Sequence, residues 1–518
     1  MRHIKLASLI RALKSVLISG RSVGVRLHRI WHNLGHLYQH WLINIVIGLV
    51  IEVVLIKAHN SIIVVAAQNW ALDAAMRGSA ELAMTSKATP PKKDDQLGVV
   101  FIDVDEEAWR SNRWGGGEPF RAPRDGLMTL INYALDHGAR YVILDVIVDG
   151  RVNQDDRTFC DQIVKRAARL KPDQYLLLVR TLREPLPGME QLAPELRTSP
   201  LDQALRDQPN KQIFMVAPYF QVSRDGVLRD WKLWSAGCRR DEPQRDAPDG
   251  RGHWEILPSV QLVISALEPA QTKKRPLDRD AFPWSTAAMT PKPCVVDLAA
   301  FATDGAGESA KDIDQRVWDW LSKQTELTGT KDLKPPGGEE IELTNRIFFR
   351  YKYPAPSNVH VIPAIRILER ASPEDKRLAD SLSNSMVVIG QSFEAAQDQH
   401  MTPLGTMPGS MVLVNSVKSM LKMKLLQSPS KVAERVFIFF SILFVGFMFA
   451  YFTSLGATAV LLLTFVPALL MVNYLLLSIH IWMDFAVPLL GIFAHRIIAV
   501  IEDWEHARRP AGAPRSHD

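Results

Sequence analysis

Hydrophobic residues form two kinds of segment along the chain. Near both ends they form long stretches, whereas in the middle they form short runs separated by charged residues, Gly and Pro. The first long stretch covers 41–67, and three more follow one another within 432–501, at 432–454, 455–478 and 479–501. Because a helix needs about 20 mostly apolar residues to cross a bilayer, this pattern predicts four transmembrane segments.

The first of these stretches is imperfect, because Glu52 and Lys57 interrupt it. A charged side chain at mid-bilayer costs a few kcal/mol, so Glu52 is expected to face other helices or a polar cleft. A cleavable signal peptide fits poorly, because the preceding basic region is long and no short apolar core with a small-residue cleavage site follows it. We therefore interpret 41–67 as an uncleaved anchor.

The middle of the chain, 68–431, has the pattern of a soluble α/β domain. Its apolar runs are rich in Val, Ile and Phe and predict strands, while helical periodicity separates several of them. The predicted strands are 97–105, 141–148, 175–180, 211–218, 345–351 and 385–392, and the predicted helices are 124–138, 155–170 and 257–268. Near-continuous apolar strands that alternate with helices predict a largely parallel or mixed sheet with both faces covered.

Two parts of this region differ in composition from the rest. Residues 235–255 and 269–340 are rich in Pro, Asp, Arg and Lys. Such segments are typical of surface insertions, and we expect little rigid core in either.

Charge sets the predicted orientation. The net charge is +5, and the arm 1–40 carries seven Lys and Arg residues and no acidic residue. Positive segments stay on the cytoplasmic side, so this arm and the short tail 502–518 are predicted to be cytoplasmic. The domain 68–431 then lies outside, as expected of a multi-pass protein of a bacterial inner membrane. We expect the bilayer, and not nucleic acid, to be what the basic arm contacts.

Cysteine and histidine do not predict a metal or cofactor site. Cys160, Cys238 and Cys294 contain no CxxC pair, and either one disulfide or three thiols would fit their number. Histidines recur at positions 28, 32, 36 and 40 of the basic arm, where they would form a stripe on a helix. An interfacial helix explains that stripe better than a metal site, because the arm has no carboxylate or thiolate.

Several polar residues are predicted to meet where strands end. Asp103, Asp105 and Asp145 lie at or near strand ends, Asp398 and His400 follow a late strand, and Arg124 begins a helix. In open α/β sheets, ligands bind at the carboxyl ends of the strands, so these six residues form our candidate ligand site. The alternative is that the carboxylates cap helices and pair with Arg124, which would make them structural.

No motif predicts an enzyme. The glycine run Gly115–Gly117 is not followed by Gly-Lys-Ser/Thr, so it is no phosphate loop, and there is neither a dinucleotide fingerprint nor a nucleophile elbow. We therefore expect no catalytic activity.

A series of segments occurs in an order that resembles a known family. The segments are LDAAMR (72–77), VVFIDVDEEAW (99–109), PFRAPRDGLMTLINYALDHGARYVILDVIV (119–148), QDDRTFCDQI (154–163), RDGVLRD (224–230) and MVVIGQSFEAAQDQHMTPLGTMPGSMVLVNSVKSML (386–421). Over about 70–431 the chain resembles the class-two CHASE domain, an extracellular sensory domain associated with cyclases and histidine kinases, with its trailing three membrane helices. The family's Trp-Pro-x-Pro-Arg-like turn is altered here to EPFRAPR, and 269–340 is unusually long. The resemblance implies a sensory fold but assigns no ligand and no site residue.

Three functional hypotheses follow. The first is a membrane-bound sensory or regulatory subunit that detects a small molecule or a protein and signals through its helices to a separate effector. The separate effector is expected because only 17 residues follow Ile501, where members of the resembled family commonly carry a kinase or cyclase. The second is a structural subunit of an envelope complex without a ligand, and the third, weaker one is a membrane-anchored periplasmic hydrolase. A homo-oligomer is compatible with each.

Overall fold

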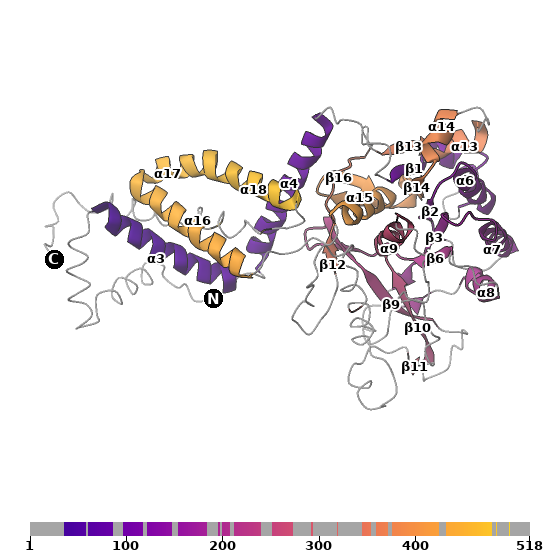
Figure 1. The fold of residues 1–518 in the computed structure, drawn as a ribbon, viewed down its shortest axis with the longest axis horizontal. Coiled ribbons are helices and arrows are strands. Elements are labelled where there is room, and N and C mark those ends of the chain that lie inside the picture. The colour runs from indigo at the N-terminus through magenta and orange to yellow at the C-terminus, as the bar shows by residue number, and fades with distance from the viewer. Residues whose placement is uncertain are drawn as a thin grey trace. The chain divides into compact units, whose positions relative to one another are not determined.

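In a computed structural model of the chain, the apolar runs of the middle region form a six-stranded sheet whose strands are all parallel (Figure 1). Its strands, in spatial order, are β13 (His360–Pro363), β1 (Gly98–Val104), β14 (Ser385–Gln391), β2 (Tyr141–Leu144), β3 (Tyr175–Val179) and β6 (Ile213–Val216). The prediction of an α/β fold with a largely parallel sheet is confirmed. Strand β13 was not predicted.

The structure describes part of the chain. The described residues are 36–57, 61–85, 97–117, 122–147, 154–183, 195–196, 199–207, 212–239, 251–272, 292–293, 344–353, 359–370, 376–423 and 431–478, with single residues at 319, 483, 490 and 497. The chain divides into two units, Met76–Leu426 and the combination of Met1–Ala75 with Gln427–Asp518. We call the first the α/β domain and the second the membrane-helix unit.

Helices cover both faces of the six-stranded sheet (Figure 1). One face carries α6 (Arg124–Asp136), α7 (Gln154–Ala167), α13 (Ala364–Arg370) and α14 (Lys376–Leu382). The other carries α9 (Val260–Thr272) and α15 (Gly409–Met423). Since successive strand residues point to opposite faces, Val100, Ile102 and Val104 join the core under α6, and Phe101 and Asp103 point toward α15.

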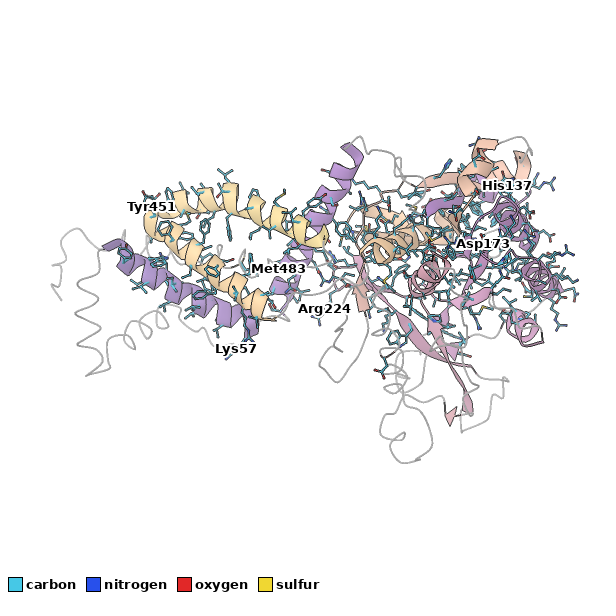
Figure 2. All side chains as sticks on the ribbon, in the orientation of Figure 1. Lys57, His137, Asp173, Arg224, Tyr451 and Met483 are labelled. Carbon is cyan, nitrogen blue, oxygen red and sulfur yellow. The ribbon has the colours of Figure 1, made fainter. Side chains whose placement is uncertain are left out.

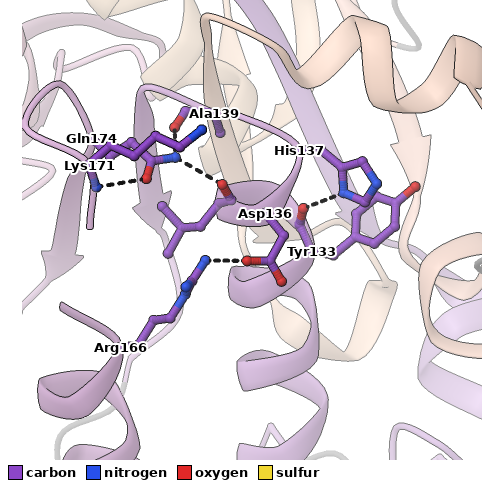
Figure 3. Close-up of polar contacts among 8 residues, drawn as sticks. Tyr133, Asp136, His137, Ala139, Arg166, Lys171 and Gln174 are labelled. Atoms are coloured by element: carbon purple, nitrogen blue, oxygen red, sulfur yellow. Dashed lines mark hydrogen bonds and ion pairs between the residues drawn. The ribbon is translucent and has the colours of Figure 1, made fainter. Parts of the chain in front are cut away.

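Polar contacts fix the turn between α6 and β2 (Figure 3). The Gln174 side-chain amide donates to the carbonyl oxygens of Leu135 and Ala139, at 2.9 and 3.0 Å. Its own carbonyl accepts from the Lys171 N–H at 3.1 Å. Gly138, with φ +84°, takes the left-handed conformation that ends helices. The Gln174 amide thus gives the Ala139 carbonyl a donor and adds a second donor to the Leu135 carbonyl, which already accepts from the Gly138 N–H.

Smaller sheets, in which most strand pairs are antiparallel, complete the α/β domain. A five-stranded sheet contains β11 (Lys292–Pro293), β10 (Arg251–Pro258), β9 (Trp234–Arg239), β5 (Glu195–Leu196) and β4 (Leu182–Arg183). A three-stranded sheet contains β12 (Thr344–Arg346), β8 (Leu228–Lys232) and β7 (Phe220–Val222), and a hairpin contains β15 (Gln399–Thr402) and β16 (Gly405–Pro408). The short helices α5 (Glu106–Arg110) and α8 (Pro200–Asp207) lie in the connections.

Two sequence predictions differ from these elements. Residues 235–255, expected to be an insertion with little rigid core, supply β9 and the start of β10, which pair through six registered positions. The other expected insertion, 269–340, lies almost wholly outside the described residues.

The apolar run predicted as a strand at 345–351 is a strand only at its start, in β12. Beyond it the backbone is held by side chains of α15: Asn415 accepts from the N–H groups of Arg350 and Tyr351, both at 2.9 Å. Ser419 accepts from the N–H of Phe348 at 3.0 Å. We call 347–353 the strap, because after a last backbone bond from Ile347 to Arg229 of β8 it follows α15.

In the membrane-helix unit, α3 (His36–Lys57) packs against α16 (Lys431–Tyr451) through small residues. A Cβ on Gly48 would lie 2.6 Å from Ile442 Cγ2, and one on Gly446 would lie 3.5 Å from the backbone of Ile45. The Trp41 indole N–H donates to the Leu443 carbonyl at 3.2 Å. Close backbone approach at small residues is typical of helix pairs in membranes.

The prediction of four membrane spans needs correction. Among the described residues, two helices are long and apolar enough to cross a membrane, Val432–Tyr451 and Leu455–Leu476. The second of these runs through α17 (Ser454–Val460), a π-helical turn (η3, Leu461–Phe465) and α18 (Val466–Ser478).

The expected anchor 41–67 instead divides between α3 and α4 (Ile62–Thr85). Its uninterrupted apolar part, Trp41–Ile51, is shorter than a span because Glu52 follows it. The expected third C-terminal span, 479–501, lies outside the described residues except at three positions. The side chains of the histidine stripe also lie outside them.

Candidate functional site

Two aspartates flank a glycine at the carboxyl edge of the parallel sheet. Asp103, near the end of β1, is in register with Gly390 of β14. On the other side of β14, Leu144 pairs with Ile389, and the next residue, Asp145, donates its N–H to the Ile389 carbonyl at 2.8 Å. Aligned residues of parallel strands point to the same face, so both carboxylates point toward α15.

The N-terminus of α15 enters this row of residues. Ser410, in its first turn, donates from Oγ to Asp145 Oδ2 at 2.7 Å. Gly390 permits the approach, since a Cβ there would lie 1.7 Å from Ser410 Oγ and 2.6 Å from Ser410 Cβ. The helix is therefore seated in the gap that the missing side chain leaves between the two aspartates.

A third carboxylate, Asp398, contacts the same helix end from the loop before β15. The Gly409 N–H donates to Asp398 Oδ2 at 3.1 Å, and a Cβ on Gly409 would lie 2.5 Å from Asp398 Oδ1. His400 Nε2 lies 3.1 Å from Asp398 Oδ1, and both side chains are about one-third exposed. Carboxylates near a helix N-terminus are stabilised by its unpaired N–H groups and dipole.

Burial changes the titration of Asp145. Burial, together with the neighbouring charge of Asp398, raises the pKa of that carboxyl to about 7. The Ser410 hydrogen bond and His400 oppose this shift. Asp145 therefore changes charge near neutral pH, as groups at functional sites often do.

Asp103 forms a second polar group a short way along the same edge. Its Oδ2 accepts from the Tyr353 hydroxyl at 2.8 Å, and that hydroxyl lies 3.2 Å from Ser392 Oγ. Asp103 Oδ1 is buried and has no hydrogen-bond partner in the described part of the chain. Burial raises the pKa of Asp103 to about 6, against the hydrogen bonds of Ser392 and Tyr353.

Asp105 has a structural role. Its Oδ1 accepts from the Ala108 N–H at 2.9 Å and caps the N-terminus of α5. Of the two readings of this residue that the sequence allows, helix capping is the one that its contact supports.

Arg124 lies away from the predicted site. Its Nε donates to Asp156 Oδ1 of α7 at 2.9 Å, and its guanidinium lies 5.7 Å from the Phe159 ring centre. Both partners belong to the helix layer on the face opposite α15. The expectation that Arg124 joins the carboxylates is therefore corrected: it forms a nearly buried ion pair between α6 and α7.

The structure thus brings together Asp145, Asp398 and His400 at the start of α15, with Asp103 two strands away. It adds Tyr353, Ser392 and Ser410, which the sequence analysis did not single out. The signal for Ser410 was its position after Gly409, where a helix begins; nothing in the sequence linked Tyr353 to Asp103.

The edge offers hydrogen-bond acceptors and no described metal centre. Within the described residues, no group of three or more His, Cys, Asp or Glu side chains is arranged to hold a metal ion. Carboxylates, hydroxyls and one imidazole suit a ligand that donates hydrogen bonds through hydroxyl or ammonium groups.

The comparison with known families fits this architecture. The sequence model of the CHASE2 domain matches residues 46–448, which is most of the chain. The chain therefore belongs to the CHASE2 family, whose domain is a sensory one associated with signalling proteins. No curated protein and no solved structure shows significant similarity to the chain.

Proposed function

We propose that this chain is a membrane-bound sensory subunit that detects a ligand at the start of α15 and signals through its helices to an effector protein. Membership of the CHASE2 family supports the sensory role. The two apolar helices support a membrane location. Membership of a family of extracellular sensory domains supports an α/β domain outside the cytoplasm.

The course of α15 carries this proposal. The helix begins at the Asp145–Asp398 site, and its Lys418 ammonium donates to the carbonyl of Leu97, just before β1. It therefore runs the full height of the sheet from the carboxyl edge to the amino edge. Residues 424–430 then connect it to α16, the first of the two candidate spans. A shift at the ligand end of α15 would be passed along one rigid element toward the membrane.

The chemistry of the site defines the expected ligand. Asp145 and Asp103 each hold a carboxyl whose pKa is near neutrality, and Asp103 Oδ1 is a buried acceptor without a partner among the described residues. A ligand with hydroxyl or ammonium donors would satisfy that acceptor and favour the charged carboxylates. Signalling requires that such a ligand bind two states of the domain with different affinity.

Hydrogen–deuterium exchange tests this proposal. The full chain is placed in nanodiscs, and putrescine and glucose serve as probes of ammonium and hydroxyl chemistry. We expect one of the probes to slow exchange in 398–423. Asp145→Asn and Asp398→Asn should each raise the probe concentration needed for this effect at least about tenfold, the scale of a lost charge-assisted hydrogen bond.

The matched control is Asp173→Asn, an exposed aspartate in the turn before β3 (Figure 2), which should respond as wild type. Unchanged exchange with both probes would contradict the ligand chemistry proposed here. Equal responses of wild type and both site variants would move the ligand away from α15. If the chain is instead a structural subunit without a ligand, Asp145→Asn and Asp398→Asn should impair folding, and neither probe should change exchange in the wild type.

A further inference from the structure

The far end of α15 carries positive charge that the described part of the domain does not balance. Lys418 and Lys422 lie one helical turn apart near the C-terminus of the helix. The Arg350 side chain comes from the strap, whose backbone at that residue is bonded to Asn415. The positive charge of Arg350 acts on Lys422, and that of Lys422 acts on Lys418.

The nearby carboxylate is already engaged. Glu268 of α9 is the acidic group that acts on Lys418, but its two oxygens accept from Arg140 at 3.0 Å and from the Tyr141 hydroxyl at 2.8 Å. Neither Lys422 nor Arg350 forms an ion pair with a described acidic residue. Lys418, Lys422 and Arg350 therefore repel one another at this edge, and the carboxylate that acts on Lys418 is also bonded to Arg140.

A helix C-terminus alone does not account for the cluster. The dipole of α15 favours a cation in its last turn, and this explains Lys422. It does not explain Arg350, whose Nε is buried and has no hydrogen-bond partner within the described residues. It also does not explain the half-buried ammonium of Lys418, because desolvation disfavours its charged form and lowers its pKa to about 8.

We propose that Arg350, Lys418 and Lys422 bind a phosphate-class oxyanion, and that its source is the headgroup of an anionic phospholipid. A guanidinium offers a planar fork of donors to two oxygens of one phosphate, and lysine ammonium groups neutralise its charge. The oxyanion would supply the missing acceptor for Arg350 Nε and separate the three like charges.

The choice of a lipid source follows from the chain itself. Lys422 is the residue before the last one of α15, and residues 424–430 connect that helix to α16, a candidate span. Anionic headgroups lie at the membrane surface where a span begins, and they attract Lys and Arg side chains close to that surface. This site is distinct from the ligand site at the N-terminus of α15 and does not depend on it.

Two measurements on the full chain test the site. The first is the melting temperature of the detergent-solubilised protein during titration with inorganic phosphate, with chloride at the same ionic strength as reference. We expect a stabilisation specific to phosphate that Lys422→Gln and Arg350→Gln each weaken about tenfold or more in apparent Kd. Arg350→Lys keeps the charge but loses the fork, and should also weaken binding.

The control variant is Lys165→Gln, an exposed lysine in the last turn of α7, which should bind phosphate as wild type does. Equal phosphate and chloride effects on wild type, or variants that bind as wild type does, would overturn the oxyanion site. Lys422→Gln removes an exposed side chain, so its loss of binding cannot be attributed to misfolding if its melting temperature without phosphate is unchanged.

The second measurement identifies the source. The protein is reconstituted into nanodiscs of phosphatidylcholine alone or of phosphatidylcholine mixed with the anionic lipid phosphatidylglycerol. We expect the anionic lipid to raise the melting temperature of wild type and of Lys165→Gln, but less that of Lys422→Gln. Phosphate binding without this lipid preference would overturn the lipid source and assign the site to a free phosphate compound.

Discussion

Ser410 and Asp145 join the first turn of α15 to the end of β2 through a 2.7 Å hydrogen bond between residues 265 positions apart in the chain. Gly390, on the strand between Asp103 and Asp145, provides the space for this contact. The bond couples a carboxyl that titrates near neutral pH to the helix that precedes the first candidate membrane span. The predictions below test that coupling and the packing around it.

A methyl group at Gly390 should displace α15. In Gly390→Ala, the new Cβ would lie 2.6 Å from Ser410 Cβ, so rotation of the hydroxyl alone cannot relieve the contact. We expect a loss of about 1–3 kcal/mol in the free energy of unfolding, typical of overpacking. Chemical denaturation of the full chain measures it.

Gly98→Ala on the neighbouring strand β1 is the control, because its Cβ would meet Ser385 Cβ at an ordinary 3.5 Å. Similar stabilities of Gly390→Ala and Gly98→Ala would show that α15 does not sit as closely on β14 as described.

The raised pKa of Asp145 predicts how stability depends on pH. The folded state holds the proton up to about pH 7, whereas the unfolded chain releases it near 3.8. Its contribution is therefore fully present below pH 3.8 and is lost as pH rises toward 7. Asp103, with a pKa of about 6, acts in the same direction.

Asp145→Asn removes this dependence while keeping an acceptor for Ser410. The variant should match wild type near pH 4 and be more stable at pH 8 by about 1–3 kcal/mol. Melting curves across this range, with Asp173→Asn as the reference substitution, provide the comparison. A variant less stable than wild type at pH 8 would indicate that the charged carboxylate is a necessary structural partner.

The sequence predicted the sheet better than it predicted the site. The continuous apolar runs 141–148 and 385–392 contain the central strands β2 and β14, because a strand buried on both faces requires such residues. Of the first run, only Tyr141–Leu144 is a strand. The run at 345–351 has the same composition but lies against α15, where Asn415 and Ser419 replace a neighbouring strand. Composition cannot distinguish these two ways of satisfying a buried backbone.

The sequence predicted that the site residues lie at the carboxyl edge of the sheet, but not which face of the sheet each side chain points to. Asp103, Asp145 and Arg124 all lie near the carboxyl ends of β1 and β2 or the helix that follows, which the sequence order predicts. Whether a side chain points toward α15 or toward α7 depends on strand register and on helix rotation, and a single sequence does not fix either. Arg124 was placed wrongly for that reason.

Arg124 and Asp156 should behave as a structural pair. Their side chains are 9% and 7% exposed, so removing one partner leaves the charge of the other nearly buried and without this ion pair. We expect Arg124→Met or Asp156→Leu to reduce the free energy of unfolding by about 3–5 kcal/mol each, and the double variant by clearly less than their sum. A double-mutant cycle of denaturation midpoints measures the coupling. Additive effects would contradict the pair and reopen a ligand role for Arg124.

The location of the α/β domain is open to a direct test by cysteine labelling. Asp173 is exposed in a turn of this domain, and Cys160 is buried, so Cys160 can remain in place. In a background of Cys238→Ser and Cys294→Ser, we expect Asp173→Cys to react with a membrane-impermeant maleimide in intact cells. Ser8→Cys, in the basic arm, should react only after the membrane is permeabilised, because positive segments are retained in the cytoplasm. Protection of Asp173→Cys in intact cells, with labelling on permeabilisation, would place the sensory domain inside. That result would reverse the direction of signalling proposed for α15 and α16.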